Sequence, residues 1–286
     1  MTQPLFVDNL PTDSLGYNIK AYEKDGFYLP WHMHDSYELT LIQRGSGQRL
    51  VGNHIEAFSS GDMVLLGPNL PHAWKNHSKE GQSPVRALTL KIFSDHPLLQ
   101  LAQLPNMQPV MRMLESAGRG LQVTGRLRDT IAMRLRDLLG LTEYKQPAAI
   151  LDILTRLSES PDTRELLPGK SPHYTARESG GTTRVIDYIF EHHGEALNSN
   201  ILAKIAGIHP SSLGRMFRRN TGFTPTEFIN QVRINYACQL LQETGLQILE
   251  ISLRCGYDNL SWFNRVFRKY RSCTPREYRE RLVQKA

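Results

Sequence analysis

Residues 211–228 read SSLGRMFRRNTGFTPTEF, and residues 261–278 read SWFNRVFRKYRSCTPREY. When the first stretch is shifted by fifty positions, two of its arginines, a phenylalanine and its Thr-Pro-x-Glu segment coincide with those of the second. Just before these stretches the shift is forty-nine, because Ala206 and Gly207 pair with Cys255 and Gly256. The second copy therefore has one extra residue, which we expect in a turn. An internal repeat of this kind predicts that one structural unit occurs twice.

Each copy has the pattern of a helix-turn-helix unit. In the first, a turn over residues 207–210 ends at Pro210, which opens a helix whose inward face carries Leu213, Met216 and Phe217. The second copy has its turn over residues 256–259. Polar and basic residues occupy the outward faces: Ser211, Ser212, Arg215, Arg218 and Arg219 in the first copy, and Ser261, Asn264, Arg265, Arg268 and Lys269 in the second. Such side chains suit phosphates and base edges, and we predict that they bind DNA.

The distribution of charge favours the same function. Residues 182–286 contain fifteen Lys and Arg and nine Asp and Glu, out of 34 and 28 in the whole chain, so they carry its entire formal net charge of +6. A positive excess confined to one segment is expected of a DNA-binding module. The alternative is a pair of helices whose arginines are only solvated, and it explains neither the duplication nor the charge.

A known family pattern covers about one hundred residues here. Its residues are Leu202, Ala203, Gly207, Leu213, Arg215, Phe217, Gly222, Pro225, Arg233 and Ala237, then Ile251, Gly256, Tyr257, Ser261, Phe263, Arg265, Phe267, Thr274, Pro275, Tyr278 and Arg279. This segment resembles the AraC family of bacterial transcription regulators. The resemblance implies seven helices, two recognition helices in successive major grooves of promoter DNA, a long joining helix over residues 226–241, and contact with RNA polymerase.

Two residues depart from that family pattern. Ser272 stands where the second half usually has glycine, which predicts strain or a shift at the end of that helix. Gly214 stands where a longer side chain commonly reads a base, which implies that the first half reads fewer bases and relies more on Arg215.

The whole chain has the composition of a globular protein. Its 286 residues predict about two domains. Neither a signal peptide nor an apolar run of roughly 18 residues is present in the sequence, so we expect a cytoplasmic protein that does not contact membranes. Cys238, Cys255 and Cys273 show no metal-binding spacing, and we interpret them as buried thiols in a reducing compartment.

The sequence predicts an α+β multidomain protein. Short apolar runs separated by turn residues indicate a β-barrel or sandwich over residues 1–96. Residues 97–157 have helical periodicity, and residues 158–181, rich in Pro, Gly, Ser and charge, predict a flexible linker. The all-α DNA-binding domain with two helix-turn-helix units is expected over residues 182–286.

A second motif lies in the β-rich segment. Its residues are Gly26, His32, His34, Glu38 and Gly45, followed by Gly61, His72 and Asn76, with Gly67 and Asn69 in place of the usual proline and glycine. The spacing resembles the two-part motif of the cupin β-barrel, and in metal-binding cupins His32, His34, Glu38 and His72 would be the ligands. Regulators of the AraC type commonly carry such a barrel as their sensor.

The chemistry of this motif leaves three interpretations open. Three imidazoles and a carboxylate suit a divalent ion such as Zn, Ni, Fe or Mn. The same residues, together with Trp74, could instead hydrogen-bond and enclose a small polar effector such as a sugar. The third interpretation is that these histidines are only structural. Trp74 itself is also an ordinary core residue of a barrel.

The helical segment carries one regular apolar stripe over residues 127–139, formed by Leu127, Ile131, Leu135, Leu138 and Leu139. We predict that this stripe forms a homodimer, and the alternative is packing within one chain. The function predicted from the whole sequence is a transcription regulator, an activator, that responds to a small molecule and is not an enzyme. The alternatives are a metal-dependent cupin dioxygenase or isomerase fused to a DNA-binding domain, and a dimeric regulator that needs no effector.

Overall fold

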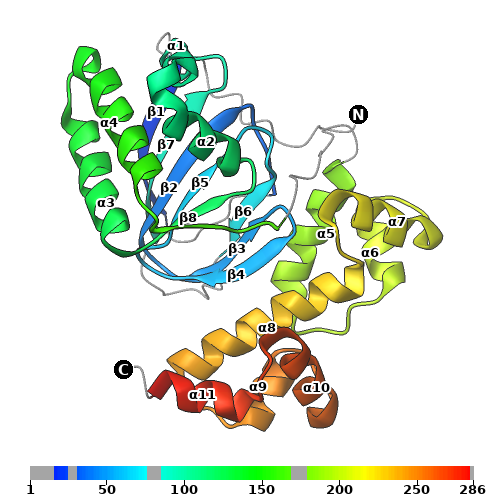
Figure 1. Ribbon diagram of the computed structural model, residues 1–286. Helices are drawn as coiled ribbons and strands as arrows, with labels where there is room; N and C mark the ends of the chain where they lie inside the picture. Colours follow the sequence, from blue (N-terminus) through cyan, green and yellow to red (C-terminus); the bar gives the residue numbers. More distant parts are fainter. Residues whose placement is uncertain (1–15, 25–30, 76–84, 169–178, 284–286) are drawn as a thin grey trace. The chain divides into compact units, whose positions relative to one another are not determined.

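The computed structural model describes residues 16–24, 31–75, 85–168 and 179–283. They form two compact units, one built on most of the strands and the helices before residue 174, the other on the helices from residue 179 onward with the segment 47–57 (Figure 1). The predicted α+β class, a barrel-like β-structure followed by helical segments, is confirmed. Within these described ranges, no helix has the length and apolar character of a membrane span.

The strands form two sheets, in the orders β1-β7-β2-β5-β8-β9 and β4-β3-β6. Their bounds are β1 Tyr17–Lys24, β2 Ser36–Arg44, β3 Gly47–Val51, β4 His54–Phe58, β5 Met63–Leu66, β6 His72–Lys75, β7 Val85–Phe93, β8 Leu121–Val123 and β9 Thr163–Glu165. Antiparallel pairing of β2 with β7 places Glu38 opposite Lys91. An isolated bridge pairs His32 with His72. These two registers bring the polar residues of the barrel together.

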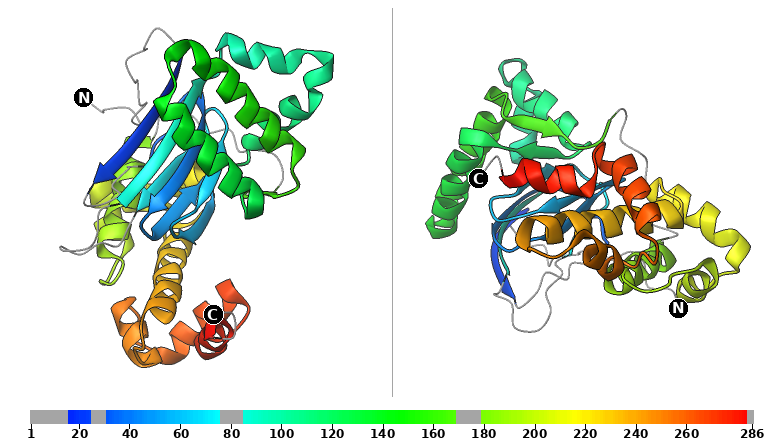
Figure 2. Two further views of the ribbon diagram at one scale, coloured as in Figure 1. Left: turned by 90° about the vertical axis from the view of Figure 1, so that its left-hand side faces the viewer. Right: turned by 90° about the horizontal axis from the view of Figure 1, so that it is seen from below.

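The two faces of β2 have different neighbours because successive side chains of a strand point to opposite sides. Leu39 and Leu41 belong to an apolar core that they share with the helices α1 Pro97–Gln100, α2 Gln108–Ala117, α3 Gly125–Gly140 and α4 Gln146–Glu159. Glu38 and Thr40 are buried on the other face. Helices α3 and α4 lie against one side of the six-stranded sheet (Figures 1 and 2).

The apolar stripe of α3 packs inside its own chain. Leu127, Ile131, Leu135 and Leu138 are buried in the core that α3 shares with α2, α4 and the sheet. These four residues therefore pack within the chain, as the alternative expected, and the predicted homodimer through residues 127–139 stays a prediction. Of the five stripe residues, Leu139 alone is well exposed, at 41%.

The predicted linker over residues 158–181 is largely structured at its two ends. Helix α4 continues to Glu159, β9 pairs with β8 in the six-stranded sheet, and Leu166 and Leu167 are buried. At the other end, α5 already begins at Ser179. Between them, residues 169–178 lie outside the described ranges. The segment 97–157 also contains β8, so its assignment as purely helical is corrected.

Seven helices occupy the described part of the C-terminal segment, as the resemblance implies. They are α5 Ser179–His192, α6 Ser199–Ala206, α7 Pro210–Thr221, α8 Pro225–Glu243, α9 Ile248–Arg254, α10 Leu260–Arg271 and α11 Pro275–Val283. The long helix α8 joins the first three to the last three (Figure 1). The three cysteines are buried here, as predicted.

The repeat in the sequence corresponds to repeated local structure. The turn glycines Gly207 and Gly256 both have left-handed backbone, with φ of 74° and 76°. Two residues separate Gly207 from α7, whereas three separate Gly256 from α10, so the extra residue lies in the second turn. Thr224 and Thr274 begin the next helices through equivalent bonds, because each backbone N–H donates to the glutamate three positions later, at 2.8 and 2.7 Å.

Ser272 ends α10 in the left-handed region, with φ of 56°. The helix is not shortened, since the N–H of Ser272 still donates to the carbonyl of Arg268 at 2.9 Å. The serine that replaces glycine therefore produces local backbone strain, as predicted, because a residue with a Cβ adopts this conformation at a cost in free energy.

Replacing Ser272 with glycine should stabilise the protein. We expect Ser272→Gly to raise the free energy of unfolding by about 0.5–1 kcal/mol, because glycine has no Cβ to strain. The matched control is Gly207→Ser, which places a side chain in the same conformation and should destabilise by a similar amount. Thermal unfolding of the full chain measures both. A lower melting temperature for Ser272→Gly would contradict the assignment of strain.

Candidate DNA interface and barrel site

The outward faces of α7 and α10 remain available to DNA. Nine of the ten residues predicted to bind DNA are exposed, and the tenth, Asn264, is half-buried. The inward residues Leu213, Phe217, Phe263 and Phe267 are fully buried, which fixes the orientation of both helices. On α10 the polar residues of the outward face line a hollow of about 600 Å³: Ser261, Asn264, Arg265, Arg268 and Lys269.

A second hollow, of about 660 Å³, lies at the N-terminal end of α10 and includes Arg233 from α8. The guanidinium of Arg233 donates to the carbonyl oxygens of His193 and Glu195, both at 2.7 Å, and lies over the ring of Tyr257. A Cβ on Gly256 would lie 2.8 Å from this guanidinium, so the turn glycine also makes room for the arginine. Arg233 therefore connects the end of α5 to the turn before α10, a role that the sequence did not reveal.

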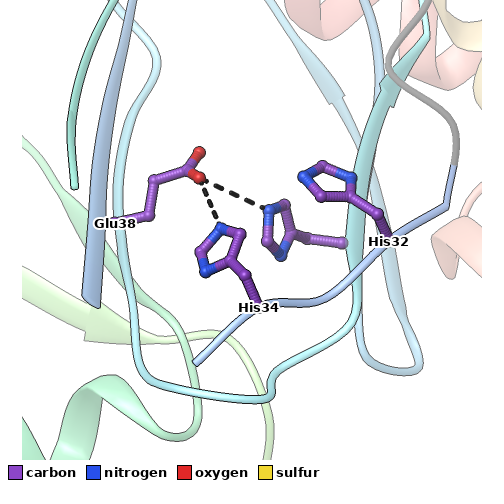
Figure 3. Close-up of side chains that lie close together, drawn as sticks. His32, His34 and Glu38 are labelled. Carbon is purple, nitrogen blue, oxygen red and sulfur yellow. Dashed lines mark hydrogen bonds and ion pairs between the residues drawn. The ribbon is translucent and has the colours of Figure 1, made fainter. Parts of the chain in front are cut away.

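The barrel brings all four predicted ligands of the second motif together. His32, His34, Glu38 and His72 are buried, and one ligand atom from each lies within 4.8 Å of the others. The Nε2 atom of His34 donates to Glu38 Oε2 at 2.8 Å, and His72 Nε2 lies 3.6 Å from the same oxygen (Figure 3). The motif residues Gly26 and Asn76 lie outside the described ranges.

The sequence analysis missed Lys91 at this site. Its ammonium lies 3.2 Å from Glu38 Oε2, and its side chain is buried. Thr40 donates to the other carboxylate oxygen at 2.7 Å and is bonded to Thr89 at 3.0 Å. The antiparallel register of β2 and β7 produces these contacts, and no local motif marks Lys91 or Thr89 in the sequence.

Glu38 is ionised and His34 is neutral in this arrangement. Burial alone raises the pKa of Glu38, but the hydrogen bond from His34, the adjacent imidazole of His72 and the positive charge of Lys91 outweigh it and hold the pKa well below its ordinary value. Burial lowers the pKa of His34 from its ordinary value, and Glu38 offsets only part of this effect. The ionised carboxylate of Glu38 thus lies directly beside the ammonium of Lys91.

The donor set fits a first-row divalent cation in its chemistry. His72 Nδ1 donates to the carbonyl of Leu70 at 2.8 Å, which turns its buried Nε2 toward Glu38 Oε2, and among the described residues this Nε2 has no partner within hydrogen-bond distance. The Trp74 ring lies 5.7 Å from the His72 ring, and its buried Nε1 likewise has no hydrogen-bond partner. A buried imidazole nitrogen without a hydrogen-bond partner, next to a carboxylate, marks a place where a ligand would be stabilised.

Known proteins match both parts of the chain. The model of the AraC-like ligand binding domain matches residues 18–159, and the model of a helix-turn-helix domain matches residues 202–281. The HTH-type transcriptional activator RhaR of Mannheimia succiniciproducens is 24% identical over 264 residues, covering 90% of this chain and 89% of that protein. The regulatory protein SoxS of Salmonella typhimurium is 39% identical over 98 residues, covering 34% of this chain and 92% of that protein.

The xylose operon regulatory protein of Escherichia coli is 31% identical over 141 residues, covering 47% of this chain and 36% of that protein. These matches and the double helix-turn-helix structure agree with one another. The chain belongs to the AraC family of transcription regulators, with a cupin-like ligand-binding domain before its DNA-binding domain. The predicted class of DNA-binding regulator is confirmed.

Two substitutions on α10 separate base contacts from phosphate contacts. We expect Arg265→Ala to weaken binding to a preferred duplex by about 1–3 kcal/mol and to relax the preference at one base position. Lys269→Ala should weaken all sequences alike and reduce the slope of log affinity against log salt by about 1. Fluorescence anisotropy with duplexes selected by the wild type measures both. Equal affinity of Arg265→Ala and wild type for the preferred duplex contradicts base reading by Arg265.

Proposed function

We propose that this protein is a cytoplasmic transcription activator whose barrel senses a sugar or related polyhydroxylated metabolite. The observation that supports this proposal most directly is the buried cluster of Glu38, Lys91, His34 and His72 beside Trp74. Sugar hydroxyls both donate and accept hydrogen bonds, so a carboxylate, an ammonium and imidazoles can bind them together. An aromatic ring beside these groups suits the apolar face of a sugar ring.

The names of the relatives support the same class of effector. One relative regulates a xylose operon, and another is named a transcriptional activator. Sensing is favoured over catalysis, because a small-molecule enzyme has no use for two helix-turn-helix units that carry the chain's excess positive charge. We further propose that the regulator contacts RNA polymerase and acts as a homodimer. Because four of the five stripe residues of α3 are buried, the dimer contact involves the exposed apolar residues of this helix, Met133 and Leu139.

Binding of a sugar by the barrel can be tested with a matched pair of substitutions. We expect one free pentose or hexose from a panel that includes D-xylose to bind the full chain saturably in calorimetry. Glu38→Gln should weaken that binding roughly tenfold or more, because a hydrogen bond to a charged group is lost. The control is Glu23→Gln, which removes an exposed carboxylate on β1 that pairs with Arg86 on β7. This control should leave the sugar affinity unchanged.

The double variant Glu38→Gln with Lys91→Met shows whether recognition or folding is lost, because it leaves no unpaired buried charge. This variant should fold and still fail to bind the sugar tightly. If no sugar of the panel binds the wild type, while the wild type still binds DNA, the sugar proposal is rejected and an effector-independent regulator is favoured.

A divalent metal is the second candidate for the cluster, supported by the unpartnered Nε2 of His72. His32, His34, Glu38 and His72 would hold Zn, Ni, Fe or Mn, and such an ion would supply a Lewis acid to polarise a bound hydroxyl. Lys91 opposes this candidate, because its ammonium already neutralises Glu38 and would repel a second cation.

Elemental analysis of the untagged full chain tests the metal. If the ion is bound, His72→Ala should lose it, and Lys91→Met should bind it more tightly because the competing ammonium is gone. The control His192→Ala, in the helical unit, should keep the wild-type metal content. No metal in either wild type or Lys91→Met after incubation with each ion would reject the metal and leave the cluster as an organic-ligand site.

A further inference from the structure

The recognition helix α10 presents a large aromatic side chain to solvent. Trp262 is 44% exposed, although the other aromatic residues nearby, Phe263 and Phe267, are fully buried. Trp262 is the third residue of α10, and its backbone N–H donates to the side chain of Asn259 at 2.9 Å. This cap fixes the first turn of α10, the part of a recognition helix that contacts base edges. The indole is therefore held at the position from which bases are read.

Arg265 stacks on this indole. Its guanidinium carbon lies over the Trp262 ring at 4.2 Å from the ring centre. Among the described residues, Arg265 forms no ion pair with a carboxylate, so its hydrogen-bond donors remain available. Both side chains line the 660 Å³ hollow at the start of α10 together with Ser261. Stacking on a rigid ring reduces the number of conformations that the arginine loses when it binds.

The stacked pair is thick enough to contact two neighbouring base pairs of DNA. An arginine that binds the O6 and N7 atoms of guanine lies close to the plane of that base pair. A ring stacked on the guanidinium then lies about one step of roughly 3.4 Å away, at the level of the neighbouring base pair. The indole is apolar, and the apolar group in the major groove is the C5-methyl group of thymine.

The first recognition helix has no such pair. The residue fifty positions before Trp262 is Ser212, and the one before Asn264 is Gly214, where an added Cβ would meet no atom within 4 Å. Arg215 therefore has no aromatic ring at the equivalent position on α7. Base-reading chemistry is concentrated on α10, whereas α7 offers mainly single arginines and serines.

The geometry points to Trp262 and Arg265 as one base-reading unit that recognises a thymine next to a guanine. Arg265 binds the guanine, and Trp262 both orients the guanidinium and contacts the thymine methyl group. In this assignment Trp262 is a specificity-determining residue, and the half-site bound by α10 carries more sequence information than the half-site bound by α7.

Removal of single thymine methyl groups tests the unit directly. Duplexes are selected from a random pool by the full-length wild type, and each thymine of the preferred sequence is then replaced by deoxyuridine. At one thymine next to a guanine, the replacement should lower wild-type affinity about fourfold, the value of burying one methyl group. For Trp262→Ala the same replacement should have no effect, and the preference for the neighbouring guanine should also fall.

Two further variants exclude a merely structural effect. Trp262→Phe keeps an aromatic ring under Arg265 and should retain part of the deoxyuridine penalty. Ser212→Ala changes the equivalent position on α7 and should retain the full deoxyuridine penalty. The proposal is overturned if folded Trp262→Ala keeps the wild-type base preferences and penalty, or if it loses affinity equally for all duplexes. If the wild type selects no sequence at all, sequence-specific binding itself fails, which is a distinct result.

Discussion

A buried carboxylate is the constraint on which the sensor barrel depends. Glu38 lies between strands in an environment that disfavours its charge, so the charge persists only because several groups compensate for it. Lys91, Thr40, His34 and His72 provide that compensation from β7, β2, the segment before β2, and β6. The strand registers and this cluster therefore stabilise each other. In the function we propose, a ligand that replaces one of these partners changes the electrostatic environment of Glu38, and the barrel responds for that reason.

In the helical unit most of the charged side chains are exposed, in contrast to the buried carboxylate of the barrel. Its arginines are exposed on α7 and α10, where we predict that they contact the phosphates of DNA, while apolar residues hold each recognition helix in place. Arg233 is the exception, because it is half-buried and bonded to the end of α5. Through Tyr257 and Gly256 it also contacts the turn before α10. It thus helps to hold α10 against the end of α5.

Local patterns predicted much of this structure, whereas contacts between distant strands and helices did not follow from them. The repeated Thr-Pro-x-Glu segment predicted both helix starts, because the capping bonds are local. The spacing of His32, His34 and Glu38 likewise predicted their meeting. Lys91 was missed because only the register of β2 with β7 brings it to Glu38. The stripe of α3 was assigned to a second chain because an apolar helix face shows that it will be buried. It does not show which surface will bury it. Trp262 was missed because inward and outward positions were judged by polarity alone.

The central claim is that the barrel cluster controls DNA binding. The most direct measurement is the affinity of the full chain for its selected duplex, titrated with the sugar that the barrel binds. The account predicts that the DNA affinity shifts with a midpoint set by the sugar's own dissociation constant. It also predicts that DNA changes the sugar affinity by the same factor. The DNA affinity of Glu38→Gln should not shift over the same sugar concentrations. A DNA affinity that stays constant at saturating sugar would contradict the claim.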